Sequence, residues 1–195
     1  MPHADSSLVP AEITTKAQFW AHIYSQLGLL LEGQKNWVTN LANASSLIYN
    51  ALLAFPSHFG SGEKAVNWCG FYLDSKLFPR SSDQNSGDDR LLLGPFCGKP
   101  ACQLINVTPG KSRGVCADGF LQKKTVLVPD VDSYPGHIAC DGETKSEIVC
   151  PLFVGSKVIG ILDLDCLALG GFDQDDQEGL EKIAALVVSS CEWQA

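Results

Sequence analysis

Thiol chemistry is the first chemistry that this sequence suggests, because eight of its 195 residues are cysteines. A cysteine reacts as the thiolate, so a reactive thiol needs both access and surroundings that favour the charged form. Cys140 meets the first condition, since it lies in a long connection, residues 129–146, that has no helical or strand period. Cys116 meets the second, since RGVCADG would place it at the start of a helix beside Arg113, an arrangement that lowers a thiol pKa.

The remaining cysteines divide by their place in the sequence pattern. Cys69 belongs to AVNWCGFYLD, where strand alternation points it away from Trp68. Cys97 and Cys102 stay as further candidates for thiol chemistry. Three others flank or lie on apolar segments and are expected to be small core residues: Cys150, Cys166 and Cys191.

Two pairs of residues have a spacing that a metal site could use. His137 and Cys140 form an H-x-x-C, and Cys97 and Cys102 form a C-x4-C. Structural zinc sites use paired C-x2-C or related spacings, which this sequence lacks. We therefore expect no metal site.

Carboxylates form a second group of candidates. In KVIGILDLD, strand alternation puts Asp163 and Asp165 on one face, about 6 to 7 Å apart. In AVNWCGFYLD it puts Trp68 and Tyr72 on either side of Gly70, which has no side chain.

These acids and aromatic rings, together with Glu147, would suit a small cation such as an ammonium group, through ion pairing and cation–π contact. Two plainer interpretations stand beside this one. The aspartates would also fit a strand that runs out into solvent, and the two rings would also fit an ordinary core.

The elements that must position these residues follow from the hydrophobic periodicity. Two amphipathic helices are expected near residues 19–31 and 37–55, a short helix near 114–124, and a terminal helix with Asp173 as its N-cap. Strands are expected near residues 65–74, 91–96, 98–107, 125–130, 146–154 and 157–165, the last two joined by a tight turn at Gly155 and Ser156. This order predicts an α/β (α+β) fold: an antiparallel sheet of about six strands, with the N-terminal helices and the C-terminal helix on one face.

Length and charge narrow the class of protein. One domain is expected over residues 15–195, after a flexible tail at 1–14, and residues 75–90 are expected to form a flexible loop. The net charge of −8 and the scattered basic residues argue against nucleic acid or membrane as a partner. The first residues do not resemble an export signal, so a cytoplasmic location is expected.

Several blocks in order resemble the free methionine-(R)-sulfoxide reductases, which are single-domain enzymes with a GAF fold. The resemblance runs from about residue 13 to 193 and is strongest in NWCGFYL, GPFCGKPAC, RGVCADG, PDVDSYPGHIACDGETKSEIVCPL and VIGILDLDC. It implies thiol-dependent reduction of free methionine sulfoxide without a bound cofactor. It also implies recycling by thioredoxin, with NADPH used indirectly through thioredoxin reductase, and a homodimer.

The resemblance assigns roles to the candidate cysteines. Cys102, Cys116 and Cys140 match the cysteine positions of the family. We expect Cys140 to attack the sulfoxide, leaving a sulfenic acid, and Cys102 to close a disulfide with it. Cys116 stays open as an alternative attacker or relay, and Cys97 as an alternative disulfide partner.

Five further residues match the substrate pocket of the family: Trp68, Tyr72, Glu147, Asp163 and Asp165. We expect Glu147 to protonate the sulfoxide oxygen, and Asp163 and Asp165 to hold the substrate ammonium group. Two alternatives from another class are a non-catalytic GAF sensor of a small ligand and a redox sensor that forms the same disulfide without turnover.

Overall fold

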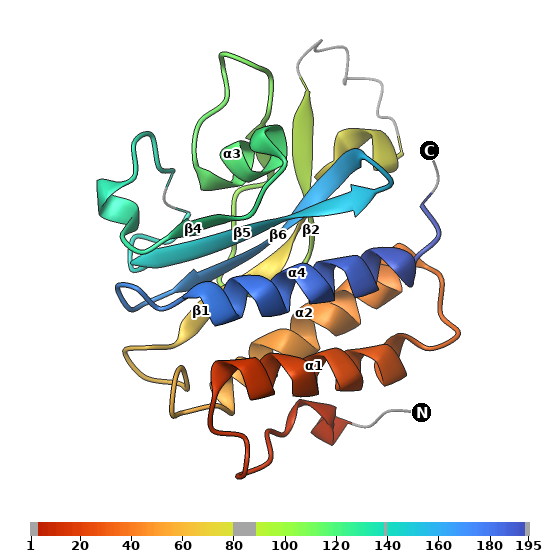
Figure 1. Cartoon of the computed structure of the whole chain (residues 1–195). Coiled ribbons are helices and arrows are strands. Elements are labelled where there is room, and N and C mark those ends of the chain that lie inside the picture. The colour runs from red at the N-terminus through yellow and green to blue at the C-terminus, as the bar shows by residue number, and fades with distance from the viewer. Residues whose placement is uncertain (1–3, 80–88, 139, 194–195) are drawn as a thin grey trace.

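A six-stranded antiparallel sheet organises the residues that the computed structural model describes, 4–79, 89–138 and 140–193 (Figure 1). The strands are β1 (Val66–Asp74), β2 (Arg90–Gly98), β3 (Leu104–Asn106), β4 (Val126–Val128), β5 (Ser146–Val154) and β6 (Lys157–Cys166). They lie in the order β3-β2-β1-β6-β5-β4. The expected hairpin is confirmed, because Val154 pairs with Lys157 across a two-residue turn in which Gly155 has a φ of 60°.

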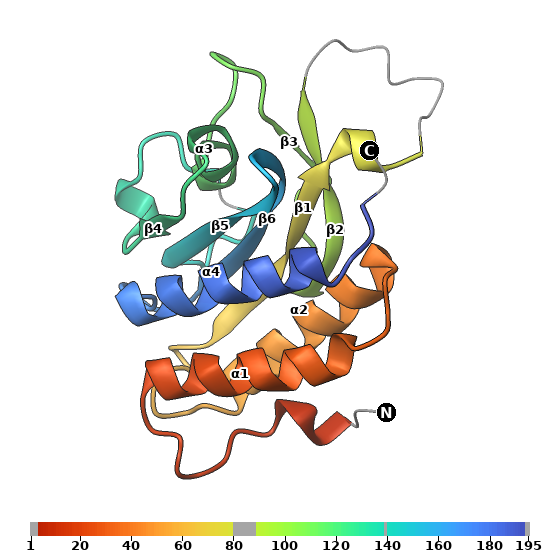
Figure 2. The same cartoon turned by 45° about the vertical axis from the view of Figure 1, so that its right-hand side comes forward.

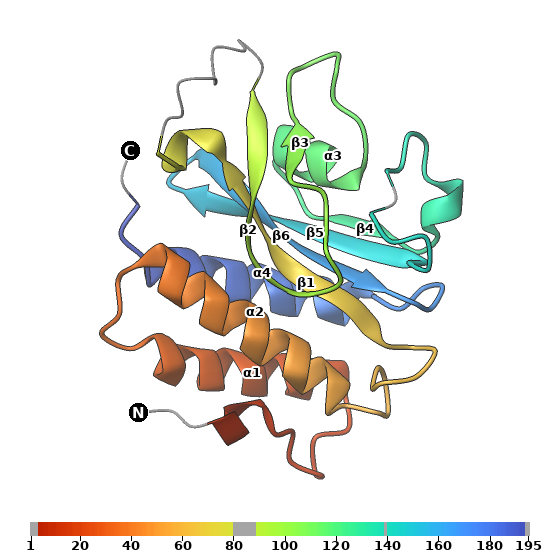
Figure 3. The same ribbon diagram turned by 180° about the vertical axis from the view of Figure 1, so that it is seen from behind.

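Three of the four α-helices found in the described residues cover one face of the sheet. They are α1 (Lys16–Leu31), α2 (Trp37–Leu53) and α4 (Gln174–Ser189); α2 and α4 lie against the strands, and α1 lies beneath them (Figures 1 and 2). The short helix α3 (Val115–Gln122) lies on the opposite face, as the view from behind also shows (Figure 3). Within the described ranges, no helix is both long and apolar enough to span a bilayer.

Side-chain caps explain where the long helices begin. The predicted N-cap Asp173 is confirmed, since its carboxylate accepts hydrogen bonds from the backbone N–H groups of Asp175 and Asp176. Asp176 is itself fully buried, where it accepts a bond of 2.8 Å from Trp20 Nε1 and pairs with Lys16 Nζ at 2.5 Å. Because Lys16 and Trp20 belong to α1, this buried ion pair joins α1 to α4.

Two apolar clusters lie on the two faces of the sheet. Leu162 and Leu164 of β6 pack with the three long helices, whereas Ile161 packs with Trp68 and Tyr72 on the face of α3. The expected alternation in this part of β6 is therefore present. The α/β (α+β) architecture that the sequence predicts is confirmed: one antiparallel sheet with both terminal helical segments on one face.

Several boundaries differ from the prediction. β3 has three residues instead of the ten expected, so Cys102 lies on the irregular segment between β2 and β3. The connection 129–146, expected to have no regular structure, contains a 3-10 helix, Val131–Ser133. Most of the predicted loop, residues 80–88, lies outside the described residues. The division into residues 1–14 and 15–195 stays a prediction; Val9 and Ile13 pack against the core.

Gly70 in β1 lets two aromatic rings lie flat across the sheet. Trp68 stacks on Phe96 with ring centroids 5.5 Å apart, and a Cβ on Gly70 would lie 2.3 Å from Phe96 Cβ and 2.6 Å from the Trp68 ring. The gap that alternation suggested beside Gly70 is therefore filled by the indole.

Replacing Gly70 with alanine is expected to lower the free energy of unfolding by about 1–3 kcal/mol, because the added methyl group overpacks this stack. Urea unfolding followed by tryptophan fluorescence measures the change. Gly28→Ala is the control, since a Cβ there meets nothing within 4 Å; it is expected to stabilise α1 by about 0.5–1 kcal/mol. Equal stability of Gly70→Ala and the parent would contradict the overpacking.

Candidate active site

Strand register brings the three predicted carboxylates together. Asp165 of β6 lies opposite Trp68 of β1 on one side and Glu147 of β5 on the other, so the three residues form one row across the sheet. Asp163 lies two residues along β6, in the row of Gly70. Because directly opposed residues of antiparallel strands share a face, this group points toward α3 and away from the long helices.

A cavity of about 200 Å3 opens above this row. Seven of the eight predicted site residues line it: Tyr72, Cys102, Cys116, Cys140, Glu147, Asp163 and Asp165. Trp68 does not line it, contrary to the expectation of an aromatic wall. It stacks on Tyr72 with ring centroids 5.7 Å apart and lines a much smaller adjoining hollow, of about 20 Å3, with Asp163 and Asp165.

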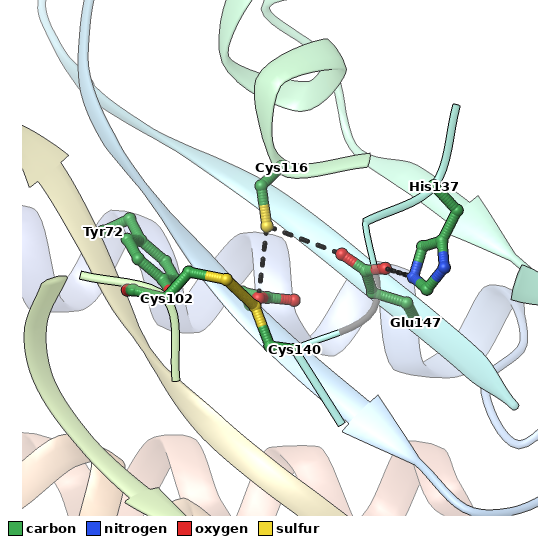
Figure 4. The surroundings of a disulfide bond; sticks show 7 residues. Tyr72, Cys102, Cys116, His137, Cys140 and Glu147 are labelled. Carbon is green, nitrogen blue, oxygen red and sulfur yellow. Dashed lines mark hydrogen bonds and ion pairs between the residues drawn. A yellow bond between two sulfur atoms is a disulfide. The ribbon is translucent and has the colours of Figure 1, made fainter. Parts of the chain in front are cut away.

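Cys102 and Cys140 are joined by a disulfide at this cavity, with their Cα atoms 6.0 Å apart (Figure 4). The Tyr72 hydroxyl donates a hydrogen bond of 2.9 Å to the carbonyl oxygen of Cys102. The pair is the one that the family resemblance implied, and its redox role stays a prediction.

Cys97 lies on the other face of the sheet, so it is not placed to replace Cys102 as a disulfide partner. Cys97 pairs directly with Cys69, which is fully buried in the core between the sheet and the long helices. The Cys97 thiol interacts with Ser45 of α2. Burial raises the pKa of both thiols. Successive side chains of a strand point to opposite faces of the sheet, and that of Cys97 points to the face that does not carry the cavity.

Lys99 holds the two cysteine segments together. Its Nζ lies 3.1 Å from Asp141 Oδ2 and also contacts Glu143, while Lys99 itself belongs to the segment that leads into Cys102. Asp141 follows Cys140 and accepts a hydrogen bond of 3.0 Å from Asn67 Nδ2 on β1. The lysine thus fixes the segment of Cys140 against the segment of Cys102.

Lys99→Met is expected to shift the Cys102–Cys140 pair toward the dithiol, by about two- to fivefold in the equilibrium constant with glutathione, because an exposed ion pair contributes modestly. Thiol trapping in glutathione buffers of increasing ratio measures the shift. Lys145→Met is the control, since Lys145 pairs with Asp132 at 2.9 Å in the same connection but does not bridge the cysteine segments. Equal shifts in the two variants would refute a specific role for Lys99.

Cys116 lies in the first turn of α3, and Gly114, with a φ of 88°, begins this helix. Its thiol donates to Asp163 Oδ2 at 3.3 Å and to Glu147 Oε1 at 3.5 Å. The predicted lowering of its pKa is wrong: burial, and then the charges of Asp163 and Glu147, raise the pKa of Cys116 well above its ordinary value. Arg113 is exposed, and the charges that shift the pKa of Cys116 are those of Asp163, Glu147 and Asp165.

The predicted raised pKa in the carboxylate group is present at Asp163 and Asp165. Burial is the largest cause and the charge of Glu147 the next, and together they raise the pKa of both aspartates well above the ordinary value. Asp163 Oδ1 is buried and has no hydrogen-bond partner among the described residues. Three crowded acids of this kind favour a shared proton or a bound cation.

His137 is a site residue that sequence reasoning did not place here. Its Nε2 lies 3.4 Å from Glu147 Oε2, and both side chains line the cavity (Figure 4). The sequence offered only its spacing from Cys140, which suggested a metal ligand and not a partner for an acid. Lys111 and Arg113 also line the cavity and were not predicted to do so.

Two contacts hold α3 over the sheet. The Tyr134 hydroxyl, in the long connection, donates a hydrogen bond of 2.6 Å to Asp118 Oδ2 on α3. Gly119 lets the helix approach β5, since a Cβ there would lie 2.7 Å from Val149 Cγ1. The site therefore combines a disulfide, a third thiol and buried acids, which is a composition suited to two-electron reduction coupled to proton uptake.

Comparison with known proteins agrees with this chemistry. Residues 77–189 match the model of the GAF domain. The chain is 48% identical to the free methionine-R-sulfoxide reductase of Saccharomyces cerevisiae over 83% of its own length and 79% of the relative. It is 36% identical to the enzyme of that name from Escherichia coli, over 87% of each chain.

The chain belongs to the free methionine-R-sulfoxide reductase family. The predicted family, and with it the prediction of an oxidoreductase, is confirmed. The structure also resembles a free methionine-R-sulfoxide reductase of Neisseria meningitidis solved with its substrate, with a TM-score of 0.73 and 33% identity over 94% of this chain and 92% of that one.

Proposed function

We propose that this protein reduces free L-methionine-(R)-sulfoxide to L-methionine, as its relatives are named for doing. The observation that supports this most is the disulfide between Cys102 and Cys140 at a cavity lined by Glu147, Asp163 and Asp165. A reductase of this kind needs a thiol to accept oxygen, a second thiol to close a disulfide, and a proton source.

The aspartates that line the cavity support a preference of the enzyme for a free amino acid as its substrate. Asp163 and Asp165 would hold the substrate ammonium group, and Tyr72 would border it. Trp68 supports this part of the site from behind through its stacking on Tyr72. A peptide-bound methionine sulfoxide has no ammonium group at that position and would leave the buried acids unpaired.

The chemistry then runs in two steps. The thiolate of Cys140 attacks the sulfoxide sulfur, the sulfoxide oxygen takes up one proton and passes to Cys140 as a sulfenic acid, and methionine leaves as its S–O bond breaks. The thiol of Cys102 attacks the sulfenic sulfur, releasing water and closing the disulfide. Glu147, oriented by His137, is placed to supply a proton to the oxygen.

Cys140 is favoured over Cys116 as the attacking residue by its surroundings. Cys140 is exposed, whereas the Cys116 thiol is held by two carboxylates that raise its pKa and disfavour the thiolate. Cys116 then serves as a donor to Asp163 and Glu147, or as a relay.

The catalytic cycle closes when the Cys102–Cys140 disulfide is reduced again. The dithiol of thioredoxin would reduce the Cys102–Cys140 disulfide by exchange, and NADPH would supply the electrons through thioredoxin reductase. No cofactor bound to the protein is needed for these steps. A homodimer in the cytoplasm is the expected setting.

The decisive experiment supplies the purified protein with thioredoxin, thioredoxin reductase, NADPH and free methionine-(R)-sulfoxide. Sustained NADPH consumption with methionine formed in equal amount is expected, and the (S)-epimer or a peptide-bound sulfoxide is expected to give far slower consumption. A single burst limited to one equivalent of protein would indicate a redox sensor. No consumption together with tight binding of a small ligand would indicate a sensory GAF domain.

A further inference from the structure

Cys116, Glu147 and Asp163 converge on one point from three separate elements, α3, β5 and β6. Figure 4 shows the Cys116 thiol pointing toward the Glu147 carboxylate. One potential ligand atom from each, the sulfur and a carboxylate oxygen from each acid, lies within 4.8 Å of the other two. Glu147 and Asp163 are both 5% exposed. Asp163 Oδ1 is buried and finds no hydrogen-bond partner in the described ranges, so this carboxylate is left with unused ligand capacity.

We propose that these three side chains form a binding site for a divalent cation of borderline softness such as Zn2+. A thiolate and two carboxylates are ligands that Zn2+ accepts, and three protein ligands with an open fourth position is the usual arrangement at zinc sites that stay accessible. The fourth position here faces the cavity, where water or a substrate group completes the coordination. The sulfur ligand favours Zn2+ over Mg2+ and Ca2+, which prefer oxygen ligands alone.

The surroundings support the acids as ligands. His137 Nε2 lies 3.4 Å from the Glu147 Oε2 atom, whereas the thiol contacts Oε1, so the imidazole can orient this carboxylate while leaving the other oxygen for the metal. Binding replaces the thiol proton of Cys116 by the cation, because the thiolate is the ligand. Sequence spacing does not reveal this site, since its ligands are brought together only by the packing of α3 on β5 and β6.

Occupancy of this site has a regulatory consequence that rests on the proposed function. The cation would take the acids that the mechanism assigns to the substrate ammonium group and to proton transfer. Zn2+ would then block reduction of methionine sulfoxide reversibly, without forming or breaking a covalent bond. Chelation would restore activity.

The direct test uses Co2+ as a spectroscopic substitute for Zn2+, added to the protein with its Cys102–Cys140 disulfide intact. In this form Cys102 and Cys140 are joined, and Cys116 is the cavity cysteine that keeps a free thiol. A thiolate-to-Co2+ charge-transfer band in the near ultraviolet therefore reports on Cys116. One equivalent of Co2+ is expected to produce the band, and Zn2+ is expected to remove it. Absence of the band at micromolar protein and metal would overturn the proposal.

Variants make the assignment specific. Cys116→Ser is expected to lose the band, and Asp163→Asn to weaken Co2+ binding at least tenfold, with circular dichroism showing that both variants are folded. Cys97→Ser is the matched control, because Cys97 is a half-buried free cysteine on the other face of the sheet. Loss of the band in Cys97→Ser, or its persistence in Cys116→Ser, would refute the site. If Cys116→Ser does not fold, unchanged Co2+ affinity in Asp163→Asn would refute it.

The activity measurement separates the two proposals. With the metal-free protein, turnover tests the reductase function alone. If turnover occurs, Zn2+ is expected to inhibit it and a chelator to restore it; turnover unaffected by saturating Zn2+ would contradict the regulatory consequence. If no turnover occurs, the proposed function fails, while the Co2+ titration still decides the metal site.

Discussion

Serine in place of Cys140 is expected to abolish reduction of methionine-(R)-sulfoxide with dithiothreitol as reductant. The decrease in kcat should be at least about a thousandfold. Without the nucleophile the whole covalent pathway is lost, whereas loss of one stabilising contact would only slow it. Dithiothreitol bypasses the resolving step, so the loss reports on the attack itself. The measurement is the rate of methionine formation at saturating substrate.

Two other cysteine variants make this result interpretable. Cys102→Ser should keep activity with dithiothreitol but lose it with thioredoxin, since the Cys140 sulfenic acid then has no partner with which to close the disulfide. Cys97→Ser should behave as the parent protein in both assays, because Cys97 faces the long helices. Full activity in Cys140→Ser combined with loss in Cys116→Ser would identify Cys116 as the attacking residue.

The sequence predicted the elements of this fold well because their signals are local. Alternation in β6 separates Ile161 and Asp163 from Leu162 and Leu164, and the structure keeps the two sets on opposite faces. The capping aspartate Asp173 likewise acts within its own first helical turn. Such patterns depend on neighbours in the chain, so they need no knowledge of register.

The site was predicted less completely because its properties depend on register and burial. Alternation predicted a shared face for Asp163 and Asp165, but not the row that joins Trp68, Asp165 and Glu147 across three strands. Trp68 was expected to form a wall of the pocket, but its indole fills the space over Gly70 and does not line the larger cavity.

The error at Cys116 has the same origin. A helix start beside an arginine suggested a lowered pKa, yet the helix turns the thiol toward Asp163 and Glu147, which raise the pKa instead. A local motif predicts the position of this cysteine in α3. The charge that faces it comes from strands far along the chain, which a motif does not reveal.

Glu147→Gln is expected to lower kcat by about a hundredfold or more while changing KM little, because general acid catalysis typically contributes that much. Glutamine keeps the size of the side chain and can still contact His137, but it cannot release a proton to the sulfoxide oxygen. Steady-state kinetics with dithiothreitol measures both constants, and Glu178→Gln, an exposed glutamate of α4, is the control.

Asp163→Asn tests whether Asp163 binds the substrate while Glu147 supplies the proton. If Asp163 holds the substrate ammonium group, its loss should raise KM for the free amino acid more than it lowers kcat, the opposite of the pattern expected for Glu147→Gln. Asp163 Oδ1 is buried and has no hydrogen-bond partner among the described residues, so this carboxylate has acceptor capacity left for that contact. An unchanged kcat in Glu147→Gln with a large fall in Asp163→Asn would reverse the assignment, making Asp163, whose pKa burial raises, the proton donor.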